Sequence, residues 1–258
     1  MKLLIFVPDI SSVKKLDGKT IDNYHMQSIK KSIKIPCWTV GILVIATIAT
    51  YFYRHRYDKY ELTEEEQQTV MLEAKKQGKT LVAYFSWQAT EEVDGVTCAS
   101  LVNIDGKTIG NTEHVAALFA KELGADLFRI ETERTYPLTR GALIESTKEE
   151  QDKNEHPALK THVEDMDQYE IIFLGYPLWW YDFPMPIYSF FDEYNLEGKT
   201  IVLFTTHAGN RFCKTLRTAQ DLLPTSPIVQ GLATHEDDVA DAESNIKRWL
   251  IHAGFSCR

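Results

Sequence analysis

The sequence predicts an α/β domain in which a doubly wound, five-stranded parallel sheet carries helices on both faces. Apolar, β-rich segments alternate with segments of helical periodicity from Lys79 onwards, and two of the strand segments, 169–177 and 199–207, contain the apolar runs IIFL and IVLF. Strands that are apolar on both faces are typical of a parallel sheet covered by helices on either side. The chain of 258 residues is long enough for one such domain and a further segment.

The predicted elements alternate along the chain without interruption. The expected strands are 80–86, 125–131, 169–177, 199–207 and 226–233. The expected helices are 111–123, 139–153, 185–195, 211–223 and 239–254. Gly124 ends the first of these helices and Gly254 the last, because glycine readily adopts the left-handed conformation that closes a helix.

An uncharged segment of 19 residues, 35–53, precedes the domain and predicts one transmembrane helix. Its length matches a hydrocarbon core of roughly 30 Å. Aromatic side chains stand near both ends, as at a membrane interface, and Arg54-His55-Arg56 follows directly. Two alternatives are a buried core helix, disfavoured by the uniform apolarity and charged flanks, and a cleaved signal peptide, disfavoured by the long leader.

The chain therefore divides into four predicted parts. They are a basic, unassigned segment (1–34), the transmembrane helix (35–53), a polar helical stalk (54–78) and the α/β domain (79–258). Within the stalk, Thr63 and Glu66 have the spacing of a capping box.

The distribution of charge separates the first parts from the domain. Residues 1–59 carry 10 Lys and Arg against 4 Asp and Glu, and the remaining residues carry 18 against 33. Five lysines just before the apolar segment, against three basic residues just after it, favour an N-terminus inside the cell. We therefore expect a single-pass membrane protein whose acidic domain lies outside the cytosol. An acidic domain also argues against a nucleic-acid partner, and the four cysteines match no zinc site.

In doubly wound sheets ligands bind beyond the carboxyl ends of the strands, which directs attention to three loops. The first contains Ser86, directly after the first strand, and Gly110-Asn111-Thr112 at the start of the following helix. A helix N-terminus binds phosphate readily, since its unpaired N–H groups and positive dipole end face the ligand. The alternative interpretation is that Asn111 or Thr112 only caps the helix.

The second and third loops contain aromatic and polar residues. The second includes Pro177, Leu178, Trp179, Trp180 and Tyr181, and the third includes Thr206, His207, Gly209 and Asn210. Consecutive aromatic residues at a strand end suit stacking on a planar ring, although they also suit filling a gap against neighbouring helices. The third loop offers hydrogen-bond donors, and its alternative role is a capped helix start with a structural histidine.

Taken together, these loops resemble the flavodoxin family over about residues 79–254. Ser86 and Gly110-Asn111-Thr112 match the two ends of the family's phosphate loop, S-x-T-G-N-T, and DQYEIIFLGYPLWW (167–180) is the most specific match. The resemblance implies the strand order 2-1-3-4-5. It also implies that Trp87 to Ile109 is an insertion in the phosphate loop, for which we expect a hairpin around Asp105-Gly106.

The family implies FMN as the cofactor. Its phosphate would lie on Ser86, Gly110, Asn111 and Thr112, and its ring between the 177–182 and 206–211 loops. The third loop departs from the family pattern in one respect. It reads Ala208, Gly209, Asn210, Arg211, where the family has further glycines.

The first function hypothesis is a membrane-anchored FMN-binding protein that transfers electrons or hydride. It would exchange them with a redox partner protein or with a small-molecule donor or acceptor, and no side chain is assigned a catalytic role. The second hypothesis is a non-catalytic, membrane-tethered binding module of the same fold that has lost flavin. Hydrolysis is disfavoured because Ser86 lacks a G-x-S-x-G setting.

Overall fold

A computed structural model describes residues 63–75, 78–87 and 100–255 of the chain. The predicted basic segment (1–34) and transmembrane helix (35–53) lie outside these residues, as does most of the first half of the predicted stalk. None of the helices in the described ranges combines the length and the apolar character that crossing a membrane requires.

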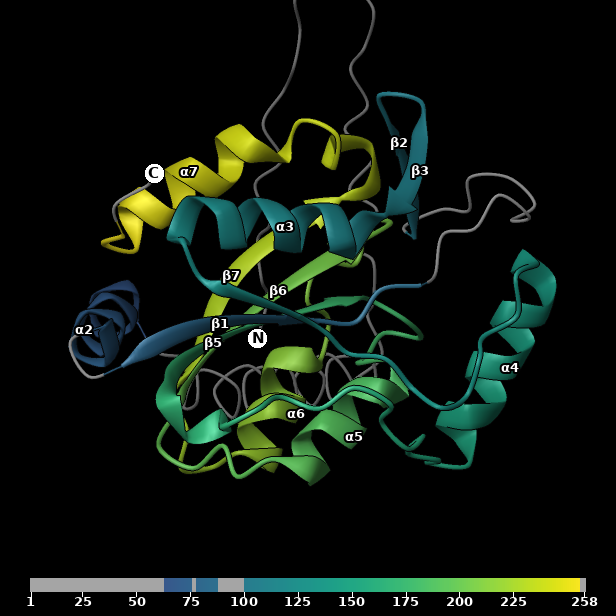
Figure 1. The fold of residues 1–258 in the computed structure, drawn as a ribbon, viewed down its shortest axis with the longest axis horizontal. Coiled ribbons are helices and arrows are strands. Elements are labelled where there is room, and N and C mark those ends of the chain that lie inside the picture. Colours follow the sequence, from purple (N-terminus) through teal and green to yellow (C-terminus); the bar gives the residue numbers. More distant parts are fainter. Residues whose placement is uncertain (1–62, 76–77, 88–99, 256–258) are drawn as a thin grey trace, which may run out of the picture. The chain divides into compact units, whose positions relative to one another are not determined.

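The described residues contain a five-stranded parallel sheet in the order β4-β1-β5-β6-β7, which confirms the predicted order (Figure 1). The strands are β1 (Lys79–Tyr84), β4 (Asp126–Arg129), β5 (Tyr169–Pro177), β6 (Thr200–His207) and β7 (Ile228–His235). One row of side chains crosses the whole sheet and consists of Leu127, Val82, Phe173, Val202 and Val229. The row is apolar throughout and is buried from β1 to β7, whereas Leu127 on the edge strand β4 is 48% exposed.

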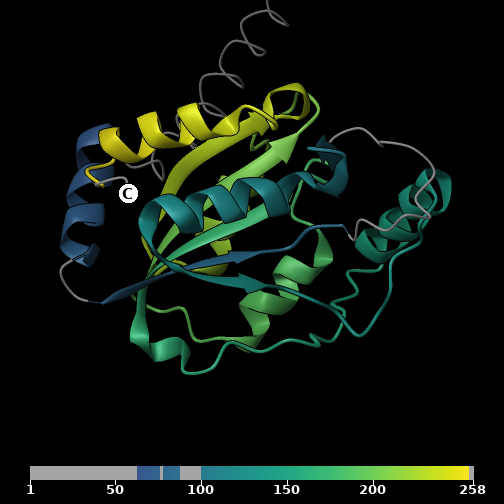
Figure 2. The same cartoon turned by 45° about the horizontal axis from the view of Figure 1, so that its top comes forward.

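Helices cover both faces of the sheet. Figures 1 and 2 show α3 (Asn111–Leu123) and α7 (Ala242–His252) on one face, and α5 (Met185–Glu193) and α6 (Thr215–Leu222) on the other. The remaining helix of the alternation, α4 (Arg140–Asp152), stands beyond the end of the strands instead of on a face (Figure 1). Two short 3₁₀ helices complete the described structure, at Met166–Gln168 and Glu236–Asp238.

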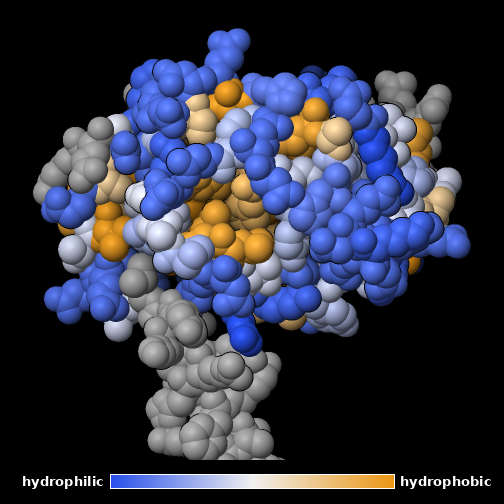
Figure 3. Space-filling model, turned by 90° about the horizontal axis from the view of Figure 1, so that it is seen from below, coloured by the Kyte–Doolittle hydropathy of each residue, from blue (hydrophilic) through white to orange (hydrophobic). Residues whose placement is uncertain are grey.

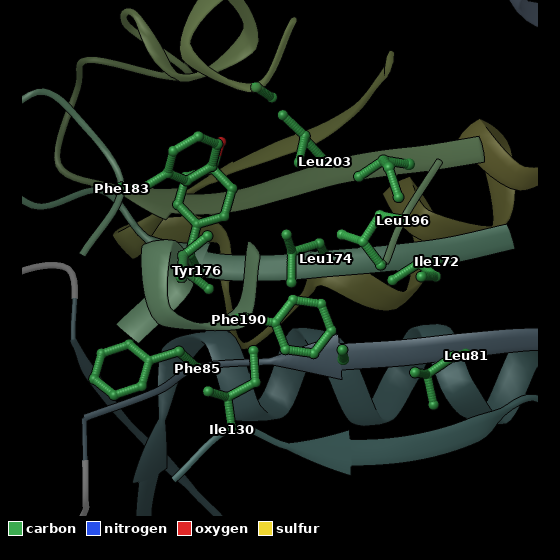
Figure 4. Packing of buried hydrophobic residues seen from close by; sticks show 14 of the residues in the cluster. Leu81, Phe85, Ile130, Ile172, Leu174, Tyr176, Phe183, Phe190, Leu196 and Leu203 are labelled. Atoms are coloured by element: carbon green, nitrogen blue, oxygen red, sulfur yellow. The ribbon is translucent and has the colours of Figure 1, made fainter. Parts of the chain in front are cut away.

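The core consists of two apolar clusters, one on each side of the sheet. Alternate residues of β1 supply them: Leu81 faces the cluster under α5 and α6, and Val82 faces the cluster under α3 and α7. This alternation follows from the two-residue side-chain period of a strand. Figure 4 shows the first cluster, in which Tyr176 and Phe183 pack edge to face with ring centroids 4.6 Å apart.

The predicted helix at 211–223 begins later than expected, at Thr215. Residues 211–214 form turns, and Arg211 and Cys213 have positive φ angles of 50° and 46°. A right-handed helix cannot contain residues in this conformation, so the third loop is longer than the sequence pattern indicates.

The helix α2 (Glu64–Lys75) occupies part of the predicted stalk. Its capping box is present, since Thr63 N donates to Glu66 Oε2 at 2.8 Å and Glu66 N donates to Thr63 Oγ1 at 3.3 Å. Met71 is 1% exposed and belongs to the cluster under α3 and α7. Along this side α2 therefore packs into the core instead of being polar all round.

A hairpin connects the start of the domain to α3. Its strands are β2 (Leu101–Ile104) and β3 (Lys107–Gly110), and Asp105 and Gly106 form the two-residue turn with φ angles of 50° and 80°. Positive φ at both turn residues matches the twist of a hairpin. The expected hairpin is thus present, and its second strand runs directly into α3, so that the hairpin sets the position of the helix N-terminus.

The side of the body that carries α5 and α6 has exposed apolar surface. Figure 3, seen from below, shows hydrophobic residues in the middle of this face among hydrophilic ones. Leu222 of α6 has an exposed fraction of 46%. Single exposed apolar side chains are common on folded proteins, so this surface alone assigns no function.

Candidate functional site

Ser86 and Gly110 are in contact at the carboxyl end of β1, although 87–109 separate them in the sequence. A Cβ atom on Gly110 would collide with Ser86 Oγ and would lie 3.2 Å from the backbone oxygen of Trp87. Ser86 is buried, with 5% of its surface exposed. The two predicted ends of the first loop therefore meet, and the close approach requires glycine at position 110.

The first turn of α3 lies at this contact. Gly110 is the N-cap residue and has no side chain to cap the helix, so neither Asn111 nor Thr112 has the capping role that was the alternative interpretation. The Asn111 backbone N–H donates to Ser100 O at 2.9 Å, which ties the helix start to the base of the hairpin. The Thr112 and Thr206 hydroxyls share a buried hydrogen bond of 2.8 Å.

The side chain of Asn111 is the most informative feature of this turn. It is 1% exposed, and neither its amide nitrogen nor its oxygen has a hydrogen-bond partner within the described residues. An unpaired buried amide costs about 1–3 kcal/mol. A phosphate oxygen would accept from the amide and would face the positive end of α3, so the residues present fit a phosphate group at this place.

A tight turn presents the aromatic residues of the second loop. Trp179 N donates to Asp182 O at 3.2 Å and Asp182 N donates to Trp179 O at 2.9 Å, which leaves Trp180 and Tyr181 as the two turn residues. Their φ angles are 51° and 64°. Bulky side chains in this left-handed region carry strain of about 1–3 kcal/mol each, so the surrounding structure must hold the turn.

The carboxylate of Asp182 connects this turn to the two helices that follow it. It is 5% exposed, and it accepts from Lys214 Nζ at 2.9 Å and from the Tyr188 hydroxyl at 2.8 Å. Burial raises the pKa of Tyr188 above its ordinary value, and the adjacent carboxylate of Asp182 adds to the increase. The turn is therefore fixed to both α5 and the start of α6.

A cleft of about 410 Å³ opens beside the second and third loops. Its lining includes five predicted site residues: Leu178, Trp179, Trp180, Tyr181 and Asn210. The other predicted residues are not among its lining: Ser86, Gly110, Asn111, Thr112, Pro177, Thr206, His207 and Gly209. Ser100 lines the cleft and accepts the Asn111 N–H, so the cleft and the first turn of α3 are adjacent.

Sequence reasoning missed one wall of the cleft. Four residues of α4 line it: Arg140, Leu143, Ile144 and Thr147. The available signal was that α4 follows β4, whose carboxyl end lies at the same edge of the sheet as those of β5 and β6.

The third loop is held by its own histidine. Gly209 N donates to His207 Nδ1 at 2.9 Å, and His207 is 5% exposed. Burial lowers the pKa of His207 below its ordinary value, and the nearby His235 and Arg211 lower it further. The ring is therefore held neutral, which corresponds to the structural role that the sequence also allowed.

Trp87, directly after Ser86, is buried in a small cluster next to the cleft. It is 1% exposed, packs with Leu101 and Leu143, and donates from Nε1 to Pro137 O at 3.2 Å. Trp179 packs against the same cluster. A large side chain thus occupies space immediately beyond the Ser86 end of the first loop.

Comparisons with known proteins agree with this arrangement. A family model described as flavodoxin matches residues 99–252, which is more than half of the chain. Flavodoxin 1 of Escherichia coli K12 is 25% identical over 126 residues, which span 46% of this chain and 57% of the relative. Flavodoxin 1 of Salmonella typhimurium gives the same identity and coverage. The match thus spans less than two thirds of the length of these relatives.

Two solved structures share the fold. A protein from Bacteroides eggerthii, described as a flavoprotein, has a TM-score of 0.53 and 25% identity, and the match covers 69% of this chain and 99% of that one. A second, from Bacteroides uniformis, has a TM-score of 0.52 and 22% identity, with 67% and 98% covered. The strand order, the Ser86–Gly110 contact and the extent of the family match lead to one conclusion: the chain belongs to the flavodoxin family.

Proposed function

We propose that this chain binds FMN and transfers electrons or hydride between a donor and an acceptor. Membership of the flavodoxin family supports FMN as the cofactor, and flavodoxins act with redox partners. The observation that carries the proposal is the buried, unpartnered amide of Asn111 beside the contact of Ser86 with Gly110. When bound, FMN would supply the electron- or hydride-accepting chemistry, and the protein would supply binding, orientation and electrostatics.

The residues of the first loop would hold the phosphate. The Ser86 hydroxyl and the Asn111 amide provide donors, and Gly110 allows the backbone to approach closely. The Thr112 hydroxyl would contribute through its partner Thr206 by keeping the helix start next to β6.

The second loop would hold the ring. Trp179 is held by T-shaped contacts with two neighbours: its centroid lies 5.4 Å from Phe85 at 87° and 5.6 Å from Tyr136 at 71°. Trp179 also lines the cleft, where an indole would stack on a planar ligand. Apolar side chains of Leu143, Ile144 and Leu178 line the same cleft and would exclude water from the ring.

The decisive experiment is an FMN titration of the full chain, purified in mild detergent, followed by quenching of flavin fluorescence. We expect saturable binding that Asn111→Ala weakens by about 10- to 150-fold, because a charge-assisted hydrogen bond is worth about 1.5–3 kcal/mol. Asn245→Ala on α7, away from the cleft, is the matched control. Equal affinity in both variants would show that the phosphate does not lie on Asn111.

Reduction of the loaded protein would identify the donor class. Rapid loss of the visible flavin absorbance on mixing with NADH or NADPH supports a small-molecule donor. Resistance to both nucleotides, together with reduction by a redox protein, supports transfer between proteins.

We further propose that residues 35–53 anchor the chain in a membrane with its N-terminus inside the cell. The support is the uncharged 19-residue segment and the five lysines before it. The test is alkaline carbonate extraction of cell membranes, followed by protease treatment of intact cells. Recovery of the full chain in the soluble fraction would refute the anchor, and protection of the α/β domain from the protease would reverse the orientation.

The second candidate function is a flavodoxin-fold binding module without flavin. The burial of Trp87 next to Ser86 and the hydrogen bond from Asn111 N to Ser100 O favour it, since the indole fills space beside Ser86 and the bond uses a backbone donor of the helix start. Absence of FMN binding by a folded full chain, over the micromolar range, would select this alternative.

A further inference from the structure

We propose that Thr147 and Glu150 on α4 are positioning residues that hold Trp179 and Trp180 as the aromatic wall of the cleft. The positioning of the two tryptophans is argued from the geometry of α4 alone. Its effect on FMN binding rests on the proposed function. Neither residue has been assigned a role by the sequence or by the family match.

The helix α4 is weakly attached to the body. Only Leu143, Thr147 and Glu150 of its thirteen residues are buried, and they recur at the spacing of one helix face. Figure 1 shows the helix beyond the end of the strands, and not on a sheet face like α3 or α5. A helix with so little apolar burial gains little from core packing, so its polar contacts decide where it stands.

Thr147 holds Trp180 directly. The Trp180 indole Nε1 donates to Thr147 Oγ1 at 3.0 Å, and the same hydroxyl donates to Leu143 O at 2.8 Å. Trp180 is one of the two strained turn residues, with φ of 51°. The hydrogen bond therefore fixes an indole whose backbone conformation is itself unfavourable.

Glu150 holds Trp179 through Tyr136. The Tyr136 hydroxyl donates to both carboxylate oxygens of Glu150, at 3.0 and 2.9 Å, and the Tyr136 ring packs edge to face on Trp179. Arg134 Nη1 lies 3.3 Å from the same carboxylate. Burial raises the pKa of Glu150, while the phenol hydrogen bond and Arg134 act in the opposite direction.

A buried carboxylate is costly, so its contribution here is orientation instead of net stability. Glu150 is 1% exposed and does not line the cleft. It lines a second, smaller pocket together with Thr147, Trp179 and Trp180. One face of α4 thus holds both tryptophans, and neither Thr147 nor Glu150 needs to touch the reacting atoms to affect the site.

The test compares Thr147→Val, which removes the hydroxyl at nearly constant shape, with Thr147→Ser, which keeps it. In the apo-protein we expect faster backbone hydrogen exchange within 140–152 for the valine variant only, with α3 and the strands unchanged. In the FMN-loaded protein we expect FMN to dissociate about fivefold faster from the valine variant, as for one lost neutral hydrogen bond. The serine variant should match the wild-type protein in both measurements.

Tyr136→Phe tests the second contact and keeps the aromatic ring. It should change the near-ultraviolet circular dichroism of the aromatic cluster and speed exchange within 140–152, because Glu150 then retains Arg134 as its partner without the phenol. Trp180→Phe removes the other partner of the Thr147 hydrogen bond, the indole donor. It is the variant to use if Thr147→Val does not fold.

The outcomes separate this inference from the proposed function. Unchanged exchange within 140–152 in Thr147→Val and Tyr136→Phe would overturn the positioning role, whether or not FMN binds. Equal acceleration in the valine and serine variants would also overturn it, since the hydroxyl would then be irrelevant. Failure of the wild-type chain to bind FMN would refute the proposed function, while the exchange measurements on the apo-protein would still decide the role of α4.

Discussion

The hydroxyls of Thr112 and Thr206 lie 2.8 Å apart in the buried interior, 94 residues apart in the sequence. Thr112 belongs to the first turn of α3, and Thr206 to the end of β6. Leu178 N donates to Thr206 O at 2.9 Å, so the same residue of β6 also holds the start of the second loop. Thr206 therefore joins all three loops at the carboxyl edge of the sheet.

Replacement of Thr112 by valine should lower the free energy of unfolding by about 1–3 kcal/mol, because the Thr206 hydroxyl is then buried without its partner. Thr112→Ser keeps the hydroxyl and should cost less. Urea denaturation of the variants measures the difference. In the double variant Thr112→Val/Thr206→Val the loss should be smaller than the sum of the single losses, and additive values would show that the two hydroxyls do not interact.

Gly110→Ala should weaken both folding and FMN binding. The φ of Gly110 is −67°, an ordinary value, so the expected loss comes from the collision of the new Cβ with Ser86 Oγ and not from backbone strain. We expect a loss of about 1–3 kcal/mol in unfolding free energy, as for overpacking. Ser86→Ala in the same chain should recover part of it, and no recovery would mean that the two residues are not in contact.

Stability should fall on acidification through the titration of His207. The pKa of this residue is lowered in the folded protein, so the unfolded chain binds the proton more tightly. The contribution of the neutral ring is therefore fully present above the unfolded pKa of about 6.5 and is lost as pH falls through the folded pKa. Protonation also removes the acceptor for Gly209 N–H.

Denaturation curves at several pH values between about 7.5 and 5 measure this effect. His207→Asn keeps a short acceptor without the titration and should show a flatter dependence. The pKa of this ring also depends on His235, Arg211 and Asp238. The pH dependence of the wild-type protein is therefore compared with that of His207→Asn. If the unfolding free energies of the two proteins change in parallel with pH, His207 is not the source of the pH dependence.

Gly175→Ala should destabilise the core of the sheet. A Cβ at this position would run into the aromatic ring of Phe204 on the neighbouring strand. We expect a loss of about 1–3 kcal/mol. Gly141→Ala on α4 is the matched control, because nothing lies within 4 Å of its new Cβ, and alanine there should gain about 0.5–1 kcal/mol. A neutral Gly175→Ala would mean that Phe204 moves without cost.

Much of the fold follows from local patterns in the sequence. The continuous apolar runs of β5 and β6 predict buried parallel strands, and Asp105-Gly106 predicts the hairpin turn, because each signal depends on residues adjacent in the chain. The meeting of Ser86 with Gly110 was also predictable, since a strand end and a helix start must lie at the same edge of such a sheet. The reading of 87–109 as an insertion stays a prediction.

What only the tertiary structure decided lies between elements that are distant in sequence. No periodicity indicates that Thr147 accepts from Trp180, that Glu150 accepts from Tyr136, or that Trp87 is buried beside the site. Each of these contacts depends on where α4 stands and on the strained turn at Trp180-Tyr181, and side-chain direction across loops leaves no repeat in the sequence. The sequence by itself thus determined the strands and, through the family resemblance, their order and the sheet edge at which the three loops meet. The packing of α4 and the loops decided the walls of the cleft, because loop contacts are specified by geometry in three dimensions and not by spacing along the chain.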